Sequence, residues 1–310
     1  MLIVLAGPTA SGKSSLAMSL AKRLNGEIIC ADSRQVYQNL EIGTARPSLA
    51  DQEKIPHHLF GVIDPRENFT VTDYRLAAER CIQELESAGK VPILVGGTGL
   101  YLRTLLYDYS IPAVSPLPAY REQLEQQEAL HPGSAHQQLQ MLDPLAAEKL
   151  HPNDSRRVIR ALEVFKSTGE SILKYQQRSH QLRDHCHYFA LNLSKELLYA
   201  RIQKRIAQMI EQGLIEEVQS LCQKFGSNLP LLKTLNYAEI IDYLQGSIDL
   251  DQAKEQMFIH TRQYAKRQRT WFRRDADICW FDIQVAEDLK QVPEQILNRL
   301  AQPFTQESCL

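Results

Sequence analysis

Short apolar runs alternate with segments of helical periodicity along most of the chain. Five runs have the length and apolar content of buried strands: residues 2–6, 27–31, 91–95, 188–193 and 277–282. Between them, Ser14 to Leu24 carries apolar residues at helical spacing, and a helix beginning at Thr70 or Thr72 should stop at Gly89. Strands that alternate with helices predict an α/β fold with a parallel sheet.

The pattern changes between about residues 110 and 185. Pro112, Pro116 and Pro118 mark the change, and Gln, Glu, Leu and Ala then recur with helical periodicity. Breaks at 131–133 and 151–154 divide the segment into short helices, and no further strand is expected before Tyr188. The predicted parts are the beginning of an α/β core at 1–112, a helical insertion at 113–186, and core completion with basic C-terminal helices at 187–310.

Composition describes an ordinary globular protein and limits its partners. The chain has 310 residues, 44% hydrophobic and 23% charged, and contains no run of about 18 apolar residues, so no membrane span is expected. Six scattered cysteines without a C-x-x-C pair, and an N-terminus too short for a signal peptide, favour a reducing cytoplasm and buried thiols. With a net charge of −2, any nucleic-acid surface must be a local patch.

The first predicted strand runs into a loop of the form G-x-x-x-x-G-K-S. Strand, loop and helix follow in the order of a phosphate-binding loop, which a chance glycine turn would not require. Glycines let successive N–H groups point inward, and the helix N-terminus adds its positive end. Lys13 brings a charge to the phosphates, and the Ser14 hydroxyl can bind Mg²⁺. The predicted phosphate-binding residues of this P-loop NTPase-like fold are Gly7, Pro8, Thr9, Ala10, Ser11, Gly12, Lys13 and Ser14.

Two further segments follow predicted strands. Asp32 comes directly after the second run, so it should face the same crevice as Lys13. Its carboxylate could accept a proton or bind the metal, and capping a turn is the structural alternative. Gly96 and Gly97 stand where a P-loop NTPase usually has a metal-binding acid. Nucleotide hydrolysis is therefore not the expected reaction, and the glycines should leave room for a bulky substrate.

Basic residues gather in three predicted helices. Arg156 and Arg160 share one face, where a phosphate contact and a solvated surface are equally compatible with the pattern. Arg201 and Arg205 share a face of the helix at 195–212 and suit a leaving phosphate. Residues 260–274 hold six Lys or Arg and no acid, with a stripe formed by Arg262, Lys266, Arg269 and Arg273. This stripe predicts a nucleic-acid contact, with a solvated face as the alternative.

Together these motifs closely resemble the tRNA dimethylallyltransferase family over nearly the whole chain. They are GPTASGKS (7–14), DSRQVY (32–37), IGTARP (42–47), VGGTGLYL (95–102), HPNDSRRVIRALEV (151–164), MIEQGLIEEV (209–218) and TRQYAKRQRTWFR (261–273). The glycine loop alone is unspecific, but its combination with the others is highly specific. One departure stands at 235–239, where Asn236 and Ala238 replace the Gly and Lys of the G-Y-K-E seen in many members. This difference affects a local turn and one possible tRNA contact, and it leaves the expected chemistry unchanged.

The resemblance implies transfer of a dimethylallyl group from its diphosphate to N6 of adenosine 37 in tRNA, next to the anticodon. It implies that Thr9, Lys13, Ser14, Arg205 and Mg²⁺ neutralise the diphosphate leaving group. Asp32 would accept the N6 proton from a base that has left the anticodon loop. Arg205 is preferred to Arg201 because it matches the family pattern before Met209.

The same resemblance assigns a larger set of residues to the anticodon stem-loop and implies a cytoplasmic monomer. The residues so assigned to tRNA are Asp32, Ser33, Arg34, Gln35, Thr98, Arg121, Arg156, Arg157, Val158, Ile159, Arg160, Arg262, Lys266, Arg269 and Arg273. Those at 33–35 and Thr98 would surround the flipped base, and the others would grip the stem and loop.

Three other functions remain open from the sequence. A P-loop small-molecule kinase would use Asp32 to hold an acceptor hydroxyl, and a related enzyme would prenylate free adenine nucleotides. The basic C-terminal helices and the helical insertion are unnecessary for either. A non-enzymatic RNA-binding protein would not need Lys13, Ser14 and Asp32 in one crevice.

Overall fold

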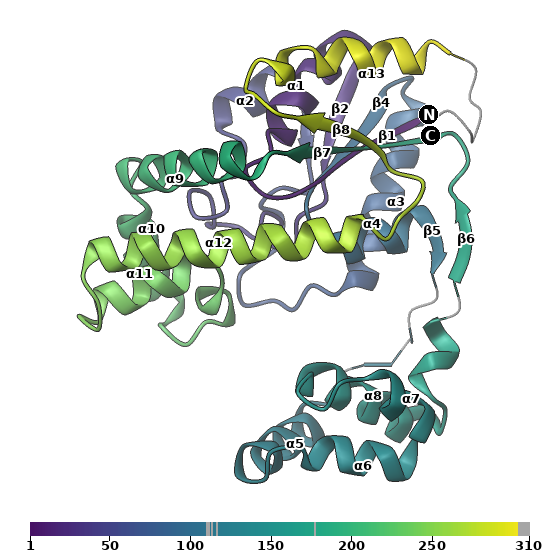
Figure 1. Ribbon diagram of the computed structural model, residues 1–310, viewed down its shortest axis with the longest axis vertical. Coiled ribbons are helices and arrows are strands. Elements are labelled where there is room, and N and C mark those ends of the chain that lie inside the picture. The colour runs from purple at the N-terminus through teal and green to yellow at the C-terminus, as the bar shows by residue number, and fades with distance from the viewer. Residues whose placement is uncertain (110–111, 113, 116, 177, 303–310) are drawn as a thin grey trace. The chain divides into compact units, whose positions relative to one another are not determined.

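The computed structural model divides the chain into two compact units, each described by itself (Figure 1). The larger unit comprises Met1–Leu106 and Leu182–Leu310, and the smaller comprises Tyr107–Gln181. The structure describes residues 1–109, 112, 114–115, 117–176 and 178–302. The inserted unit therefore begins and ends a few residues before the predicted limits of 113 and 186. Residues 113, 116 and 309, which carry part of the predicted boundary and the sixth cysteine, lie outside the described residues.

A six-stranded parallel sheet forms the centre of the larger unit, which confirms the predicted α/β fold. The strands are β1 (Leu2–Ala6), β2 (Gly26–Cys30), β3 (His57–His58), β4 (Val91–Val95), β7 (Cys186–Leu193) and β8 (Cys279–Ile283). Their order is β3-β2-β4-β1-β7-β8, so β1 lies between β4 and β7 in parallel register. Every residue of β1 is buried, because helices cover both faces of the sheet (Figure 1).

Within the described residues of the larger unit, eight longer helices, one short helix and two 3₁₀ turns accompany this sheet. They are α1 (Lys13–Leu24), α2 (Leu49–Lys54), α3 (Val71–Ser87), α4 (Gly99–Leu106), α9 (Lys195–Glu211), α10 (Leu214–Phe225), η2 (Pro230–Lys233), α11 (Tyr237–Leu244), α12 (Leu250–Phe272), η3 (Asp288–Lys290) and α13 (Val292–Leu300). Thr70 and Asp73 form a capping box that starts α3 as predicted. The basic segment belongs to α12, which packs against α9 and α11 (Figure 1).

The smaller unit is mainly helical. Its helices are α5 (Pro118–Leu130), α6 (Ser134–Leu142), α7 (Pro144–Lys149), α8 (Ser155–Thr168) and the 3₁₀ turn η1 (Ile172–Gln176). Leu124, Leu139, Val158 and Leu162 form part of its own small core. It also contains a two-stranded sheet of β5 (Tyr107–Tyr109) and β6 (Arg178–Leu182).

The expectation of no strand before Tyr188 is therefore wrong. The sequence of β6 is mostly polar and lacks an apolar alternation, so periodicity could not reveal it. The following strand, β7, also starts earlier than expected, at Cys186.

Two expectations from composition can be compared with the described residues. Cys30, Cys81, Cys186 and Cys279 are buried, Cys222 is partly buried, and none of these five forms a disulfide within the described residues. None of the helices in the described part of the chain has the length and apolar character that a membrane span requires.

Candidate functional site

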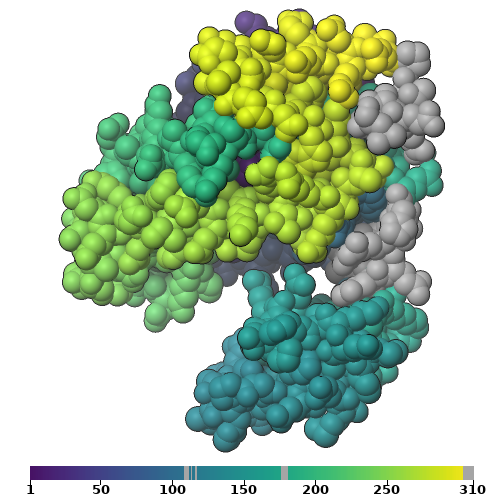
Figure 2. All heavy atoms as spheres, in the orientation of Figure 1, coloured from purple at the N-terminus to yellow at the C-terminus, as the bar shows by residue number. Residues whose placement is uncertain are grey.

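A cavity of about 1480 Å³ lies in the larger unit, beyond the carboxyl ends of β1 and β2. It is lined by the phosphate-binding loop, segment 32–35, the loop at 41–48, α9, α11 and α12. Figure 2 shows a recess between green α9 and yellow-green α12, with purple atoms of the N-terminal segment at its base. Lys13 and Asp32 both line this cavity, as do Arg201 and Arg205. Thr98 does not belong to the lining.

The phosphate-binding loop presents free N–H groups at the start of α1. Gly7 and Gly12 adopt left-handed conformations, with φ of 128° and 103°, which bend the loop over the helix N-terminus. Within the described chain, the N–H groups of residues 12–15 donate to no acceptor. Free N–H groups together with the positive end of a helix dipole form an anion site. The loop can therefore receive phosphate oxygens directly on its backbone.

Lys13 folds back on the loop that carries it. Its Nζ donates to the carbonyl oxygens of Gly7 at 2.9 Å and Pro8 at 2.6 Å. Burial and the nearby Arg205 charge lower the pKa of Lys13 to about 7, against an opposing effect of Asp32. The amine thus lies near the midpoint of its titration at neutral pH, and a bound anion would favour its charged form.

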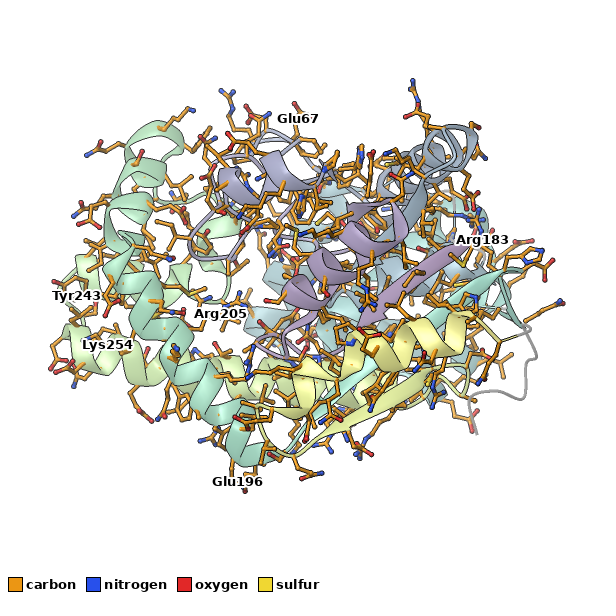
Figure 3. The ribbon with its side chains drawn as sticks, turned by 90° about the horizontal axis from the view of Figure 1, so that it is seen from above. Glu67, Arg183, Glu196, Arg205, Tyr243 and Lys254 are labelled. Atoms are coloured by element: carbon orange, nitrogen blue, oxygen red, sulfur yellow. The ribbon has the colours of Figure 1, made fainter. Side chains whose placement is uncertain are left out.

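Arg201 and Arg205 bring two more cations to the cavity from successive turns of α9. The Arg201 Nε donates to the carbonyl oxygen of Ala10 at 2.7 Å, so this arginine contacts the phosphate-binding loop itself. The Arg205 Nη2 donates to the carbonyl oxygen of Thr44 at 3.1 Å. Figure 3 shows Arg205 projecting from α9 toward the N-terminal segment. Burial lowers the pKa of both guanidinium groups, but arginine remains charged at any relevant pH.

Asp32 uses its two carboxylate oxygens differently. Its Oδ1 accepts hydrogen bonds from the N–H groups of Arg34 at 2.8 Å and Gln35 at 3.4 Å, which forms the turn considered as the structural alternative. Its Oδ2 accepts no hydrogen bond from the described residues. The carboxylate therefore caps a turn and still has one oxygen for a ligand in the cavity.

Three residues expected to surround a substrate base or make room for it also contact the protein, and two of them, Gln35 and Gly97, line the cavity. The Thr98 hydroxyl accepts from the Ser33 N–H at 2.9 Å, and Gln35 donates to the carbonyl oxygens of residues 44 and 45. A Cβ atom on Gly97 would lie 2.1 Å from Nε2 of Gln268, so this glycine makes room for a side chain of α12. These contacts hold the loop that carries Asp32.

The loop at 41–46 is fixed by Glu217 of α10, which sequence reasoning did not single out. One Glu217 carboxylate accepts the N–H groups of residues 41, 42 and 43 at 3.0, 2.8 and 3.0 Å, and the Tyr237 hydroxyl at 2.8 Å. Asn236 adopts a left-handed φ of 71° and donates to the Gly43 carbonyl at 2.7 Å. Asparagine tolerates that conformation, so the departure from glycine keeps the turn and adds a bond.

The polar residues of helix α12 lie on two distinct sides of the helix. The cavity side carries Gln256, His260, Gln263, Tyr264, Arg267 and Gln268. The predicted basic stripe of Arg262, Lys266, Arg269 and Arg273 lies on the other side, because helical positions advance by about 100° per residue. None of these four residues lines the cavity. The sequence analysis did not single out Arg267, because its place beside Lys266 does not tell which side of the helix it occupies. Only the packing of α12 shows that Arg267 faces the cavity.

In the smaller unit, two of the assigned arginines are engaged by one buried carboxylate. Glu163 has an exposed fraction of 0%. It accepts from Arg121 Nη2 at 2.5 Å and lies 3.6 Å from Arg160 Nη1. Arg160 also donates to the Val114 carbonyl at 2.9 Å. A buried carboxylate needs such partners, so these arginines stabilise the fold of the unit.

The remaining assigned residues of α8 divide by burial. The side chains of Val158 and Ile159 lie in the core of the smaller unit, so they are not available to an RNA. Arg156 and Arg157 are exposed, and Arg157 lies 3.3 Å from Asp154. An exposed ion pair of this kind contributes little stability and leaves the guanidinium accessible.

The residues present fit a magnesium ion only in a limited way. Among the described residues, no three His, Cys, Asp or Glu side chains come together as a metal site. Ser14 is exposed at the start of α1, and its hydroxyl makes no hydrogen bond within the described chain. Mg²⁺ commonly binds phosphate oxygens and water with few protein ligands, so Ser14 suits this role.

The chain is similar to enzymes of known name over nearly its whole length. A family model described as IPP transferase matches residues 35–275. The tRNA dimethylallyltransferase of Gloeothece citriformis is 49% identical over 295 residues, which cover 95% of each chain. That of Synechococcus elongatus is 45% identical over 295 residues, covering 95% of this chain and 94% of that protein.

Two solved structures are similar as well. The tRNA isopentenylpyrophosphate transferase of Bacillus halodurans has a TM-score of 0.69 and 38% identity, covering 96% of both chains. A eukaryotic dimethylallyltransferase acting on tRNA has a TM-score of 0.81 and 30% identity, covering 99% of this chain and 81% of that one.

Binding of an anion to the phosphate loop should take up a proton at Lys13. The amine is mostly neutral above pH 7 in the free protein, and a bound anion restores its charge. We expect inorganic diphosphate to bind with uptake of about one proton near pH 8, and its affinity to fall about tenfold per pH unit above 7. Titration calorimetry in buffers of different ionisation enthalpy measures that uptake. Lys13→Met is the control, and equal proton uptake in both proteins would contradict this role.

Proposed function

This chain belongs to the IPP transferase family, and from that premise we propose that it transfers a dimethylallyl group to tRNA. The donor is dimethylallyl diphosphate, and the acceptor is N6 of adenosine 37. The C–O bond of the donor breaks, the N6–C bond forms, and the products are N6-isopentenyladenosine and diphosphate. A cytoplasmic location and action as a monomer complete the proposal.

The observation that carries the proposal is the pairing of an anion site with a carboxylate in one cavity. Free N–H groups, Lys13 and Arg205 form the anion site, and Asp32, with one unused oxygen, lines the same cavity. The first group suits a diphosphate that gains charge as its bond to carbon breaks. The second suits a proton acceptor for an amine nucleophile.

An exocyclic adenine amine is a weak nucleophile, because its lone pair is delocalised into the ring. It therefore needs a positioned base as well as a positioned electrophile. Asp32 takes the N6 proton through Oδ2 while Oδ1 keeps its turn. The adenine must leave the anticodon loop to reach the cavity. Flipping a base costs about a few kcal/mol, and it costs less when the base is already unpaired.

Three cations of the cavity act on the leaving group. Lys13, Arg205 and Arg201 converge near the phosphate-binding loop, so the structure supports using both arginines rather than Arg205 alone. Thr9 contributes its hydroxyl, since its N–H is already bonded to Gln268. Mg²⁺, held by Ser14 and the diphosphate oxygens, would supply further charge neutralisation.

The tRNA surface follows from exposure and charge. Lys266 and Arg273 are exposed on the basic side of α12, and Arg156 and Arg157 are exposed on α8. Exposed basic side chains at helical spacing suit the phosphate backbone of an RNA stem. Arg34 is exposed next to Asp32, which supports a contact with the nucleotides around the flipped base.

The first test uses radiolabelled dimethylallyl diphosphate with unmodified tRNA. Label should pass to tRNA that has adenosine at position 37 and not to the same tRNA with guanosine there. Free AMP and ATP are parallel acceptors. Label on AMP, or consumption of ATP without transfer to tRNA, would favour the nucleotide prenyltransferase or the kinase instead.

Asp32→Asn tests the proton acceptor with little change in structure. Asparagine keeps an oxygen for the turn but cannot accept the N6 proton, so kcat should fall about a hundredfold or more. The dissociation constant for tRNA should stay within about threefold, as measured by filter binding. Equal losses in rate and tRNA affinity would assign Asp32 to binding instead.

Reversing charges on the basic side of α12 should flatten the salt dependence of tRNA binding. In Lys266→Glu/Arg273→Glu the slope of log K against log[salt] should fall by about 1.4 to 1.8, since each lost phosphate contact removes about 0.7 to 0.9. Lys22→Glu/Lys290→Glu, two exposed positions away from the cavity, is the control of equal charge. An unchanged slope in the α12 variant would remove this surface from the tRNA contact.

A further inference from the structure

Gln268 is a buried polar side chain where α12 meets the phosphate-binding loop. It is 5% exposed and lines the cavity next to Tyr264 and Arg267. It carries no charge and belongs to none of the groups that bind phosphate or accept a proton. A polar side chain this buried must have its hydrogen bonds satisfied, so its partners indicate its role.

The two ends of the Gln268 amide bond two separate loops. Its Oε1 accepts from the Thr9 N–H at 2.8 Å, and its Nε2 donates to the Gly97 carbonyl oxygen at 2.9 Å. Reversing the amide would set donor against donor and acceptor against acceptor, so only one orientation satisfies both partners. Gly97 has no side chain, and a Cβ there would lie 2.1 Å from Nε2. The contact thus depends on both residues.

The first loop is the one that receives the diphosphate. The bond to Gln268 uses the Thr9 N–H, which is therefore turned away from the anion site, while the N–H groups of residues 12–15 remain free. Gln268 thereby helps to set the course of the loop as it enters the helix N-terminus.

The second loop leads to Asp32 in one further step. Gly97 is followed by Thr98, whose hydroxyl accepts the Ser33 N–H at 2.9 Å. Ser33 is the neighbour of Asp32 in the chain. A continuous path of hydrogen bonds and peptide units therefore joins the phosphate-binding loop to the proton acceptor, and in this path the side chain of Gln268 bridges the two loops.

We propose that Gln268 is a positioning residue that fixes the phosphate-binding loop relative to the loop of Asp32. This inference rests on the proposed function, since it concerns the distance between leaving group and acceptor amine. Transfer between two bound substrates is sensitive to such placement, and a shift of about 1 Å can cost about a hundredfold in rate. Gln268 acts through the backbone of both loops and does not itself touch the reacting atoms.

Two substitutions separate positioning from general stability. Gln268→Met has a similar length and makes neither hydrogen bond, so kcat should fall about tenfold to a hundredfold. KM for the prenyl diphosphate and the dissociation constant for tRNA should each change by less than about threefold, because the binding groups remain in place. Thermal unfolding of each variant, measured in parallel, gives its folded fraction at the assay temperature.

Gln268→Glu adds a pH readout that a purely structural role would not produce. Its carboxylate can still accept from Thr9 but opposes the Gly97 carbonyl until it gains a proton and becomes a donor. Relative to the unsubstituted enzyme at each pH, its kcat should be lowest near pH 8 and should recover severalfold toward pH 6. Gln223→Glu, an exposed position on α10, is the matched control and should show no such recovery.

The outcomes keep this inference separate from the proposed function. If the unsubstituted chain transfers no prenyl group to tRNA, the proposed function fails. If it is active and both Gln268 variants keep normal kcat, or lose rate only in proportion to their folded fraction, the positioning role is overturned. Loss of kcat with near-normal substrate binding, and recovery of the glutamate variant at low pH, would establish it.

Discussion

The site depends on holding three cations close together while keeping their charge available. Lys13, Arg201 and Arg205 would repel one another around an empty cavity, and each is instead held by backbone carbonyl oxygens at 2.6 to 3.1 Å. Within the described residues none of them forms an ion pair with a carboxylate. Neutral acceptors fix the geometry without pairing the charges, so an arriving diphosphate meets the charges of both arginines and restores the charge of Lys13.

The loops that supply these carbonyl groups must therefore be held in place themselves. The loop at 41–46 holds Arg205 through Thr44 and is itself held by the four hydrogen bonds of Glu217. The phosphate-binding loop holds Lys13 and is tied to α12 by Gln268. Buried polar networks of this kind stabilise one geometry because an unpaired member would be costly. Residues distant in the sequence thus determine where the cations stand.

Helix α12 contributes both to the cavity and to the surface proposed for tRNA. One side contributes cavity residues and the bond to the phosphate-binding loop, while the other carries the basic stripe proposed for tRNA. A polyanion can bind the exposed side without competing with the diphosphate for the same cations. The helix begins at a complete capping box of Asp249 and Gln252, which stabilises its start independently of the site.

The sequence alone determined most strands of the sheet, the phosphate-binding loop, the position of Asp32 after β2 and the basic helix, because each follows from local periodicity or a contiguous motif. It could not decide which polar residues face the cavity. Thr98 and Gln35 bond to backbone, Val158 and Ile159 are buried, and the roles of Glu217 and Gln268 depend on partners far along the chain. Hydrogen-bond partners with large sequence separation are set by packing, and no local pattern records them. The polar strand β6 could not be predicted for a related reason, because its pairing with β5 is not reflected in an apolar pattern of its own sequence.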